Sequence, residues 1–191
     1  MPSQDPTAPS RRLPTLESPE SNPIVANLFE QIVARGARVL NVHRTLAHAP
    51  NVLVGWSTLS AALRHGSTLD RQLNELAIMR QSHVMDSEYE GYVHRNMSLH
   101  AGLSAEKIDA VKTWESSGLF NDLEKTVLRY TDAVIAGEGI PDELYEDITS
   151  KLPLPTVVEL TASISYFIGT TYLLKALGVQ VGAAEAQLSP G

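Results

Sequence analysis

Glu90 and His94 are four residues apart, a spacing at which a carboxylate and an imidazole could act together. On a helix the two side chains would lie on one face, within hydrogen-bonding reach of each other. A neighbouring carboxylate raises the pKa of an imidazole, which gives an acid/base group that works near neutral pH. A second carboxylate, Glu75, precedes this pair and would have to face it from another helix. His94, Glu90 and Glu75 are therefore the candidates for a catalytic acid/base site.

The same spacing also has plainer interpretations. Glu90 and His94 would form an ordinary surface pair, and Glu75 an exposed ion pair with Arg71, if neither helix face is buried. Such pairs contribute only a few tenths of a kcal/mol. A third alternative adds His83, since two imidazoles and two carboxylates could hold a divalent ion. We expect no metal and no cofactor.

Four further side chains are candidates for substrate binding. Ser87 could donate a hydrogen bond, and Tyr89 could present its phenol hydroxyl close to the site. Arg80 has the planar fork that binds a substrate carboxylate, although it could equally pair with an acid such as Asp86. Trp56 precedes these residues and could form a wall of a pocket, or only pack in the core.

Cysteine is absent from all 191 residues of the chain. Thiolate nucleophiles, thiol–disulfide exchange and cysteine-rich zinc sites are therefore excluded. The net charge of −7 argues against a basic surface for nucleic acid or anionic membrane. No apolar run approaches the roughly 18 residues that span a bilayer, and the polar N-terminus is unlike a signal peptide. We expect a cytoplasmic protein.

From residue 24 onward the apolar residues recur at steps of three and four, which predicts helices nearly throughout. Strand signals are nearly absent, so we predict an all-α protein. The helices are expected at residues 51–66, from 67 or 68 to 84, 87–100, from 104, 122–136, 142–152 and 155–177, after two earlier helical segments. Asn51 is the expected cap of the first helix in this series.

The chain divides into three zones by composition. Residues 1–23 contain six of the eleven prolines and are expected to be disordered, or to extend across a neighbouring subunit with Leu13 and Leu16 as anchors. Residues 24–181 form the predicted helical domain, and residues 182–191 a flexible C-terminal tail. The length suits one domain with an arm.

The segment that contains Glu75, Ser87, Glu90 and His94, followed by residues 101–104, resembles the carboxymuconolactone decarboxylase and alkyl hydroperoxidase AhpD superfamily. In the peroxidase branch a glutamate is followed by a Cys-x-x-Cys and then a histidine. Ser87 and Glu90 stand at the two cysteine positions here, and His94 at the histidine. The chain is therefore similar to the branch that lacks the Cys-x-x-Cys, and the resemblance continues weakly to residue 181.

The resemblance implies an AhpD-like multi-helix bundle and a homo-oligomer, with a trimer or hexamer favoured over a dimer. It also implies a lyase with a small-molecule substrate that is acidic or derived from an aromatic compound. The expected protein is a cofactor-independent acid/base enzyme that decarboxylates or tautomerises a small carboxylated lactone or keto acid. Asn74 stands where relatives often have an arginine, which leaves substrate binding open. Two alternatives remain: a non-catalytic member that binds a small ligand, and a thiol-independent peroxide-handling (peroxiredoxin-like) protein.

Overall fold

The computed structural model describes residues 13, 16, 22–186 and 188 of the chain. The regular elements within these residues are all helices, so the predicted all-α class is confirmed. The elements are α1 (Pro23–Ala34), α2 (Asn41–Leu46), α3 (Pro50–His65), α4 (Arg71–Val84), α5 (Glu88–His100), α6 (Ala105–Ala110), the 3₁₀ helix η1 (Val111–Ser116), α7 (Asp122–Ala136), α8 (Asp142–Lys151), α9 (Leu154–Leu177) and α10 (Ala183–Ala186).

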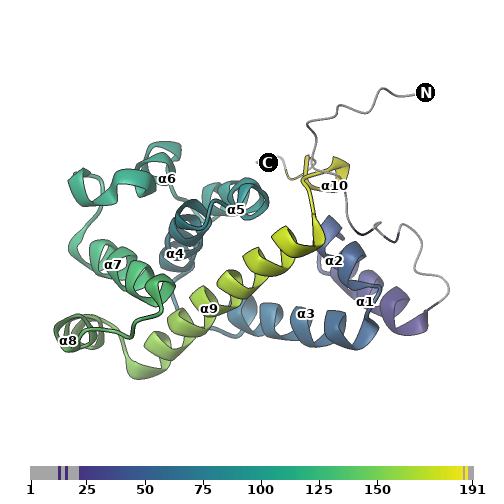
Figure 1. Ribbon diagram of the computed structural model, residues 1–191, viewed down its shortest axis with the longest axis horizontal. Helices are drawn as coiled ribbons and strands as arrows, with labels where there is room; N and C mark the ends of the chain where they lie inside the picture. The colour runs from purple at the N-terminus through teal and green to yellow at the C-terminus, as the bar shows by residue number, and fades with distance from the viewer. Residues whose placement is uncertain (1–12, 14–15, 17–21, 187, 189–191) are drawn as a thin grey trace.

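The longest helix, α9, crosses the molecule and separates two groups of helices (Figure 1). Helices α4 to α8 lie on one side of it and α1 to α3 on the other, while α10 lies beyond its C-terminal end (Figure 1). The largest core cluster joins α4, α7, α8 and α9, with Ala77, Val127, Ile148 and Leu160 fully buried. A second cluster joins α1, α2 and α3 around Leu53.

By length and composition, α9 could cross a membrane, contrary to the expectation that no segment is apolar enough. The helix packs against α3, α4, α7 and α8. A helix that contacts neighbours on several sides must be apolar on several sides, which accounts for its composition.

Helix α7 has both of its predicted ends, because each end is specified locally. Asn121 and Glu124 form a capping box, in which each side chain accepts a hydrogen bond from the other residue's backbone N–H. Gly137 ends the helix with φ of 73°, a left-handed conformation that glycine adopts without steric cost.

The predicted starts of α3 and α4 are wrong. Helix α3 begins at Pro50, whose fixed φ suits a first helical position, and not after a cap at Asn51. Helix α4 is capped by Asp70, whose side chain accepts from two backbone N–H groups of the first turn. The hydroxyls of Ser67 and Thr68, which were the expected caps, instead donate to Glu159 of α9.

A tight reversal separates α4 from α5. Asp86 has φ of 50°, and Ser87 occupies the N-cap position of α5. The helix face that carries Glu90 therefore does not continue upstream to His83, which is exposed in the last turn of α4. The two helices instead pack side by side as a hairpin.

Most of the predicted arm, at residues 1–12, 14–15 and 17–21, lies outside the described residues, as do residues 187 and 189–191 of the predicted tail. Leu16 packs against the cluster of α1–α3, and its backbone N–H donates to the carbonyl of Arg44 over 3.2 Å. The expectation of a flexible tail from residue 182 is wrong at residues 183–186, which form α10. Glu185 in α10 is completely buried, because its carboxylate accepts hydrogen bonds from two other parts of the chain.

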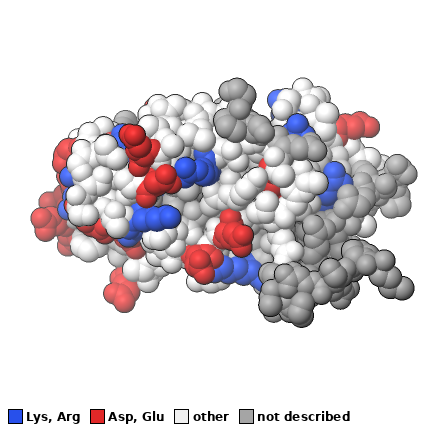
Figure 2. Space-filling model, turned by 90° about the horizontal axis from the view of Figure 1, so that it is seen from above, with Lys and Arg blue, Asp and Glu red and all other residues white. Residues whose placement is uncertain are grey.

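Acidic and basic side chains lie interspersed on the face shown in Figure 2, mainly at the end that carries α6 to α8. The ion pairs at this end include Arg95–Asp109, Lys107–Glu124 and Lys151–Asp122. This face therefore carries no extended surface of a single charge sign.

Candidate active site

The α4–α5 hairpin brings Glu75 against His94. The Oε2 atom of Glu75 lies 2.7 Å from Nδ1 of His94, and each side chain is 1% exposed. The other carboxylate oxygen, Oε1, accepts a hydrogen bond from Nε of Arg71 over 3.0 Å. The predicted ion pair of Glu75 with Arg71 thus exists, but the carboxylate is buried and also holds the imidazole ring.

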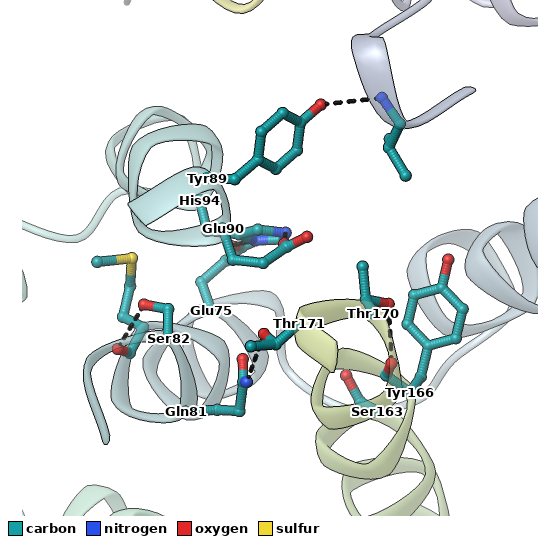
Figure 3. A network of polar contacts seen from close by, with 12 residues as sticks. Glu75, Gln81, Ser82, Tyr89, Glu90, His94, Ser163, Tyr166, Thr170 and Thr171 are labelled. Carbon is teal, nitrogen blue, oxygen red and sulfur yellow. Dashed lines mark hydrogen bonds and ion pairs between the residues drawn. The ribbon is translucent and has the colours of Figure 1, made fainter. Parts of the chain in front are cut away.

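Glu90 lies on the other side of the same ring. Its Oε2 atom is 3.3 Å from Nε2 of His94, as the four-residue spacing predicts. The two atoms are not aligned for a hydrogen bond, so the buried Nε2 has no hydrogen-bond partner among the described residues. A buried polar atom without a partner is costly and is common where a ligand binds or a proton is transferred. In Figure 3, Tyr89, Glu90 and His94 extend from one helix, across from Tyr166 and Thr170 of α9.

The charges of this group are coupled. Burial by itself lowers the pKa of His94, but the carboxylates of Glu75 and Glu90 outweigh it, so the pKa is raised above 6.5. Burial by itself raises the pKa of Glu75, but His94 and the nearby arginines outweigh it, so the pKa is lowered below 4.5. Both shifts favour an imidazolium next to a carboxylate. The proton on Nδ1 is held by Glu75, and the nitrogen available for proton transfer is Nε2.

His94 and Glu90 lie on the wall of a cavity of about 610 Å³. The cavity is lined by residues of α1, α2, α3, α5 and α9, together with the segment between α1 and α2. Four aromatic rings lie in a row along its wall. The ring centroids of His94 and Phe167 are 4.7 Å apart in an edge-to-face contact. Those of Phe167 and Tyr166 are 5.1 Å apart, and those of Tyr166 and Trp56 are 4.9 Å apart. The volume and lining are those of a site for a small organic molecule.

Tyr89 and Trp56, two of the predicted substrate-binding residues, line this cavity. The phenol of Tyr89 donates to Oε1 of Glu185 over 2.8 Å and accepts from the backbone N–H of Val42 over 3.3 Å. Burial and the Glu185 carboxylate raise the pKa of this phenol, so it stays protonated. Its hydroxyl therefore serves to join α5 to α2 and α10.

The other two predicted substrate-binding residues are not on the cavity wall. Arg80 forms a two-point contact with Asp132 of α7, at 2.6 and 3.0 Å, and Asp132 also accepts from Nε1 of Trp114. The prediction that Arg80 binds substrate in this cavity is wrong, because Asp132 already holds its guanidinium in another part of the molecule. Ser87 is buried at the start of α5 and does not line the cavity either.

The metal alternative also lacks its ligand set. His83 is exposed and lies outside the cavity. In the part of the chain that the structure describes, no group of three or more histidine, aspartate or glutamate side chains is placed to hold a metal ion.

Sequence reasoning missed several residues of the cavity. His43 accepts a hydrogen bond from the backbone of Leu40 through Nδ1, and burial with the nearby Arg64 and Arg44 lowers its pKa to about 4, so it is neutral at neutral pH. The face of α3 that lines the cavity has a signal in the sequence, because Trp56, Ser60 and Arg64 recur at steps of four. No local signal links Glu185 to Tyr89, which it contacts across the fold.

The comparisons with known proteins agree with this architecture. Residues 50–133 match the model of the Carboxymuconolactone decarboxylase family, so the predicted resemblance is confirmed. A peroxidase-related protein with the alkylhydroperoxidase AhpD core, from Ralstonia eutropha JMP134, superposes with a TM-score of 0.80 at 15% identity, over 91% of this chain and 93% of that one. This likeness confirms the AhpD-like fold.

Two other solved structures are similar over most of their length. A peroxidase-related protein from Silicibacter sp. TM1040 has a TM-score of 0.77 at 15% identity, over 99% of both chains. A cysteine-to-alanine variant of the debrominase Bmp8, in complex with 2,3,4-tribromopyrrole, has a TM-score of 0.77 at 15% identity, over 91% of this chain and 94% of that one. No protein of curated function matches the chain in sequence.

Proposed function

We propose that this chain, whose residues 50–133 belong to the carboxymuconolactone decarboxylase family, is a cofactor-independent acid/base enzyme of the cytoplasm. Its substrate in this proposal is a small carboxylated lactone or keto acid, which it decarboxylates or tautomerises. The observation that carries the proposal is the buried Nε2 of His94, which has no hydrogen-bond partner in the described part of the chain and lies on the wall of the cavity.

The proposed chemistry is a proton transfer at Nε2. In a decarboxylation the bond between the carboxylate carbon and its neighbour breaks, carbon dioxide leaves, and the electron pair delocalises into a conjugated carbonyl. The imidazolium of His94 then gives its Nε2 proton to the carbanion carbon and becomes neutral. In a tautomerisation, neutral His94 first takes a proton from one carbon and then returns it to another. After decarboxylation, a proton from water restores the imidazolium, whereas the tautomerisation returns His94 to its starting state by itself.

Each carboxylate near His94 has a separate part in this proposal. Glu75 holds Nδ1, which fixes the direction of Nε2 and favours the charged ring. Glu90 lies beside Nε2 on the cavity wall, where it favours the proton on that nitrogen and can accept a hydrogen bond from the substrate. The row of aromatic rings supplies an apolar surface that displaces water from a substrate ring.

The test is turnover by the pure protein, with and without His94. Carboxymuconolactone is the first substrate to supply, with release of carbon dioxide and loss of the conjugated lactone absorbance as readouts. His94→Gln is expected to lower kcat by roughly 10²–10⁴-fold, the usual share of general acid–base catalysis. His83→Gln is the matched control, because this histidine is exposed and lies outside the cavity, and it should keep full activity.

Full activity of His94→Gln would show that another residue is the acid. The enzymatic proposal would be wrong if the protein turned over neither carboxymuconolactone nor any member of a panel of carboxylated lactones and keto acids. The second candidate, a protein that binds a small ligand without changing it, would then hold. The similar debrominase is described in complex with a small ring compound, the kind of ligand that this second candidate requires. Thiol-based peroxide chemistry is excluded by the absence of cysteine.

A further inference from the structure

Arg64 lies near the C-terminal end of the face of α3 that lines the cavity. This face consists of Trp56, Ser57, Thr58, Ser60, Ala61, Arg64 and His65. Its members recur at helical spacing, so the helix places a large aromatic ring at one end, small residues in the middle and a guanidinium at the other end. The small residues leave open space between the ring and the guanidinium.

The guanidinium of Arg64 is half-buried and forms no ion pair or hydrogen bond with any residue that the structure describes. This distinguishes it from Arg80, which Asp132 holds, and from Arg71, which Glu75 holds. A partly buried guanidinium with five unused donors needs an acceptor, and a carboxylate fits its planar fork best.

The electrostatic surroundings of Arg64 belong to the same cavity. Its charge helps to lower the pKa of Glu75, which holds His94, and of His43, which lines the cavity. His43 is therefore neutral and does not compete for an anion. Among the described residues that line the cavity, Glu90 is the one carboxylate, and it lies next to His94. Arg35 also lines the cavity.

We infer that Arg64 determines substrate specificity by binding a carboxylate of the substrate, with the rest of the molecule lying along the aromatic row toward Nε2 of His94. This inference rests on the proposed function for the identity of the reacting end. It replaces the sequence prediction that Arg80 would bind this carboxylate.

The carboxylate bound by Arg64 is retained in the product. A guanidinium stabilises the carboxylate more than the carbon dioxide it would become, so it would oppose the loss of that group. A carboxylate that leaves must lie instead against the apolar wall formed by residues such as Phe167 and Val93, close to the proton donor. Arg64 is thus the anchor of the substrate and not part of the bond-breaking step.

The experiment compares two probes of equal shape, benzoate and benzamide, which differ in charge. Their affinities are measured by calorimetric titration at low ionic strength on the full chain, without any turnover. The wild-type protein is expected to bind benzoate about 10- to 100-fold more tightly than benzamide, the range for hydrogen bonds to a charged group. Arg64→Gln should remove this preference and leave the affinity for benzamide unchanged, whereas Arg64→Lys should retain part of it.

Arg129→Gln is the matched control, because it removes one positive charge from α7, where Arg129 lies close to Asp147 and outside the cavity. It should keep the full preference for benzoate. Equal affinities of the wild-type protein for the two probes, no binding of benzoate at millimolar concentration, or an unchanged preference in Arg64→Gln would each overturn the inference. This experiment measures binding and not turnover, so its outcome is independent of the proposed activity. If the protein binds benzoate through Arg64 but turns over no substrate, the proposed activity is wrong and the binding site remains.

Discussion

The two ring nitrogens of His94 have different surroundings, and this difference determines which of the two carboxylates orients the ring. The four-residue spacing suggested that Glu90 would orient the ring, and Glu90 does lie next to it at 3.3 Å. The aligned contact, however, is with Glu75 at 2.7 Å. A sequence shows which residues share a helix face, but not which partner from another helix approaches more closely, because this depends on how the two helices pack.

The orienting contact predicts a change in the pH dependence of activity. The pKa of His94 is raised by Glu75 and Glu90, so the protonated ring needed as an acid persists to higher pH in the wild-type protein. Glu75→Gln removes one negative charge, which lowers the pKa of His94 again. We expect the high-pH limit of activity to move to lower pH in this variant. Rate measurements across a pH series test this, and an unmoved limit would mean that another group supplies the proton.

The helices show a clear division between what local sequence predicts and what it does not. The existence and order of α3 to α9 follow from apolar periodicity, and α7 has both predicted ends because its caps are its own neighbours. The predicted start of α4 failed because Ser67 and Thr68 bond with Glu159, some 90 residues away in the chain. Arg80 was misplaced for the same reason, since its partner Asp132 lies on another helix.

Helix α10 escaped prediction altogether, because four residues are too short for a periodic pattern and one buried carboxylate holds them. Oε1 of Glu185 accepts from Asn41 N–H at 2.6 Å and from the Tyr89 hydroxyl at 2.8 Å, while Oε2 accepts from Gly182 N–H at 2.9 Å. The C-terminal turn is thereby joined to a residue of the cavity wall.

Glu185→Ala is expected to destabilise the protein, because it leaves the buried Asn41 N–H and Tyr89 hydroxyl without their acceptor. The free energy of unfolding should fall by about 2–4 kcal/mol, the range for losing hydrogen bonds to a buried charged group. Urea denaturation measures it. Glu138→Ala is the control, since Glu138 is exposed, and it should change the stability by less than about 0.5 kcal/mol. A similar small loss in both variants would contradict a structural role for Glu185.

On the scale of the whole molecule, the chain leaves large apolar side chains on its outside. Val158 and Tyr172 of α9 are 67% and 65% exposed, and Leu154 of the same helix is 60% exposed. Leu59 and Val52 of α3 are exposed as well. Large apolar side chains that are exposed in a single chain are often covered by another subunit.

We therefore keep the prediction of a closed homo-oligomer, with a trimer or hexamer ahead of a dimer. Light scattering at micromolar concentration should give a multiple of the 20.8 kDa chain mass. Val158→Lys should lower this mass, because it puts a charge into the covered surface, while Glu138→Lys on an exposed loop should leave it unchanged. A wild-type mass equal to that of one chain would rule the assembly out.

The three groups of the proposed proton transfer all come from one hairpin, α4–α5, while the walls that face them come from α1 to α3 and from α9. Contacts between neighbouring helices close a short loop and cost little chain entropy, so this hairpin can form its pairing before the distant walls arrive. The same separation bears on how such proteins diverge. Substitutions in residues 24–66 can change which molecule fits without disturbing the contact of Glu75 with His94, so new substrate ranges can be selected while one inherited reaction is kept.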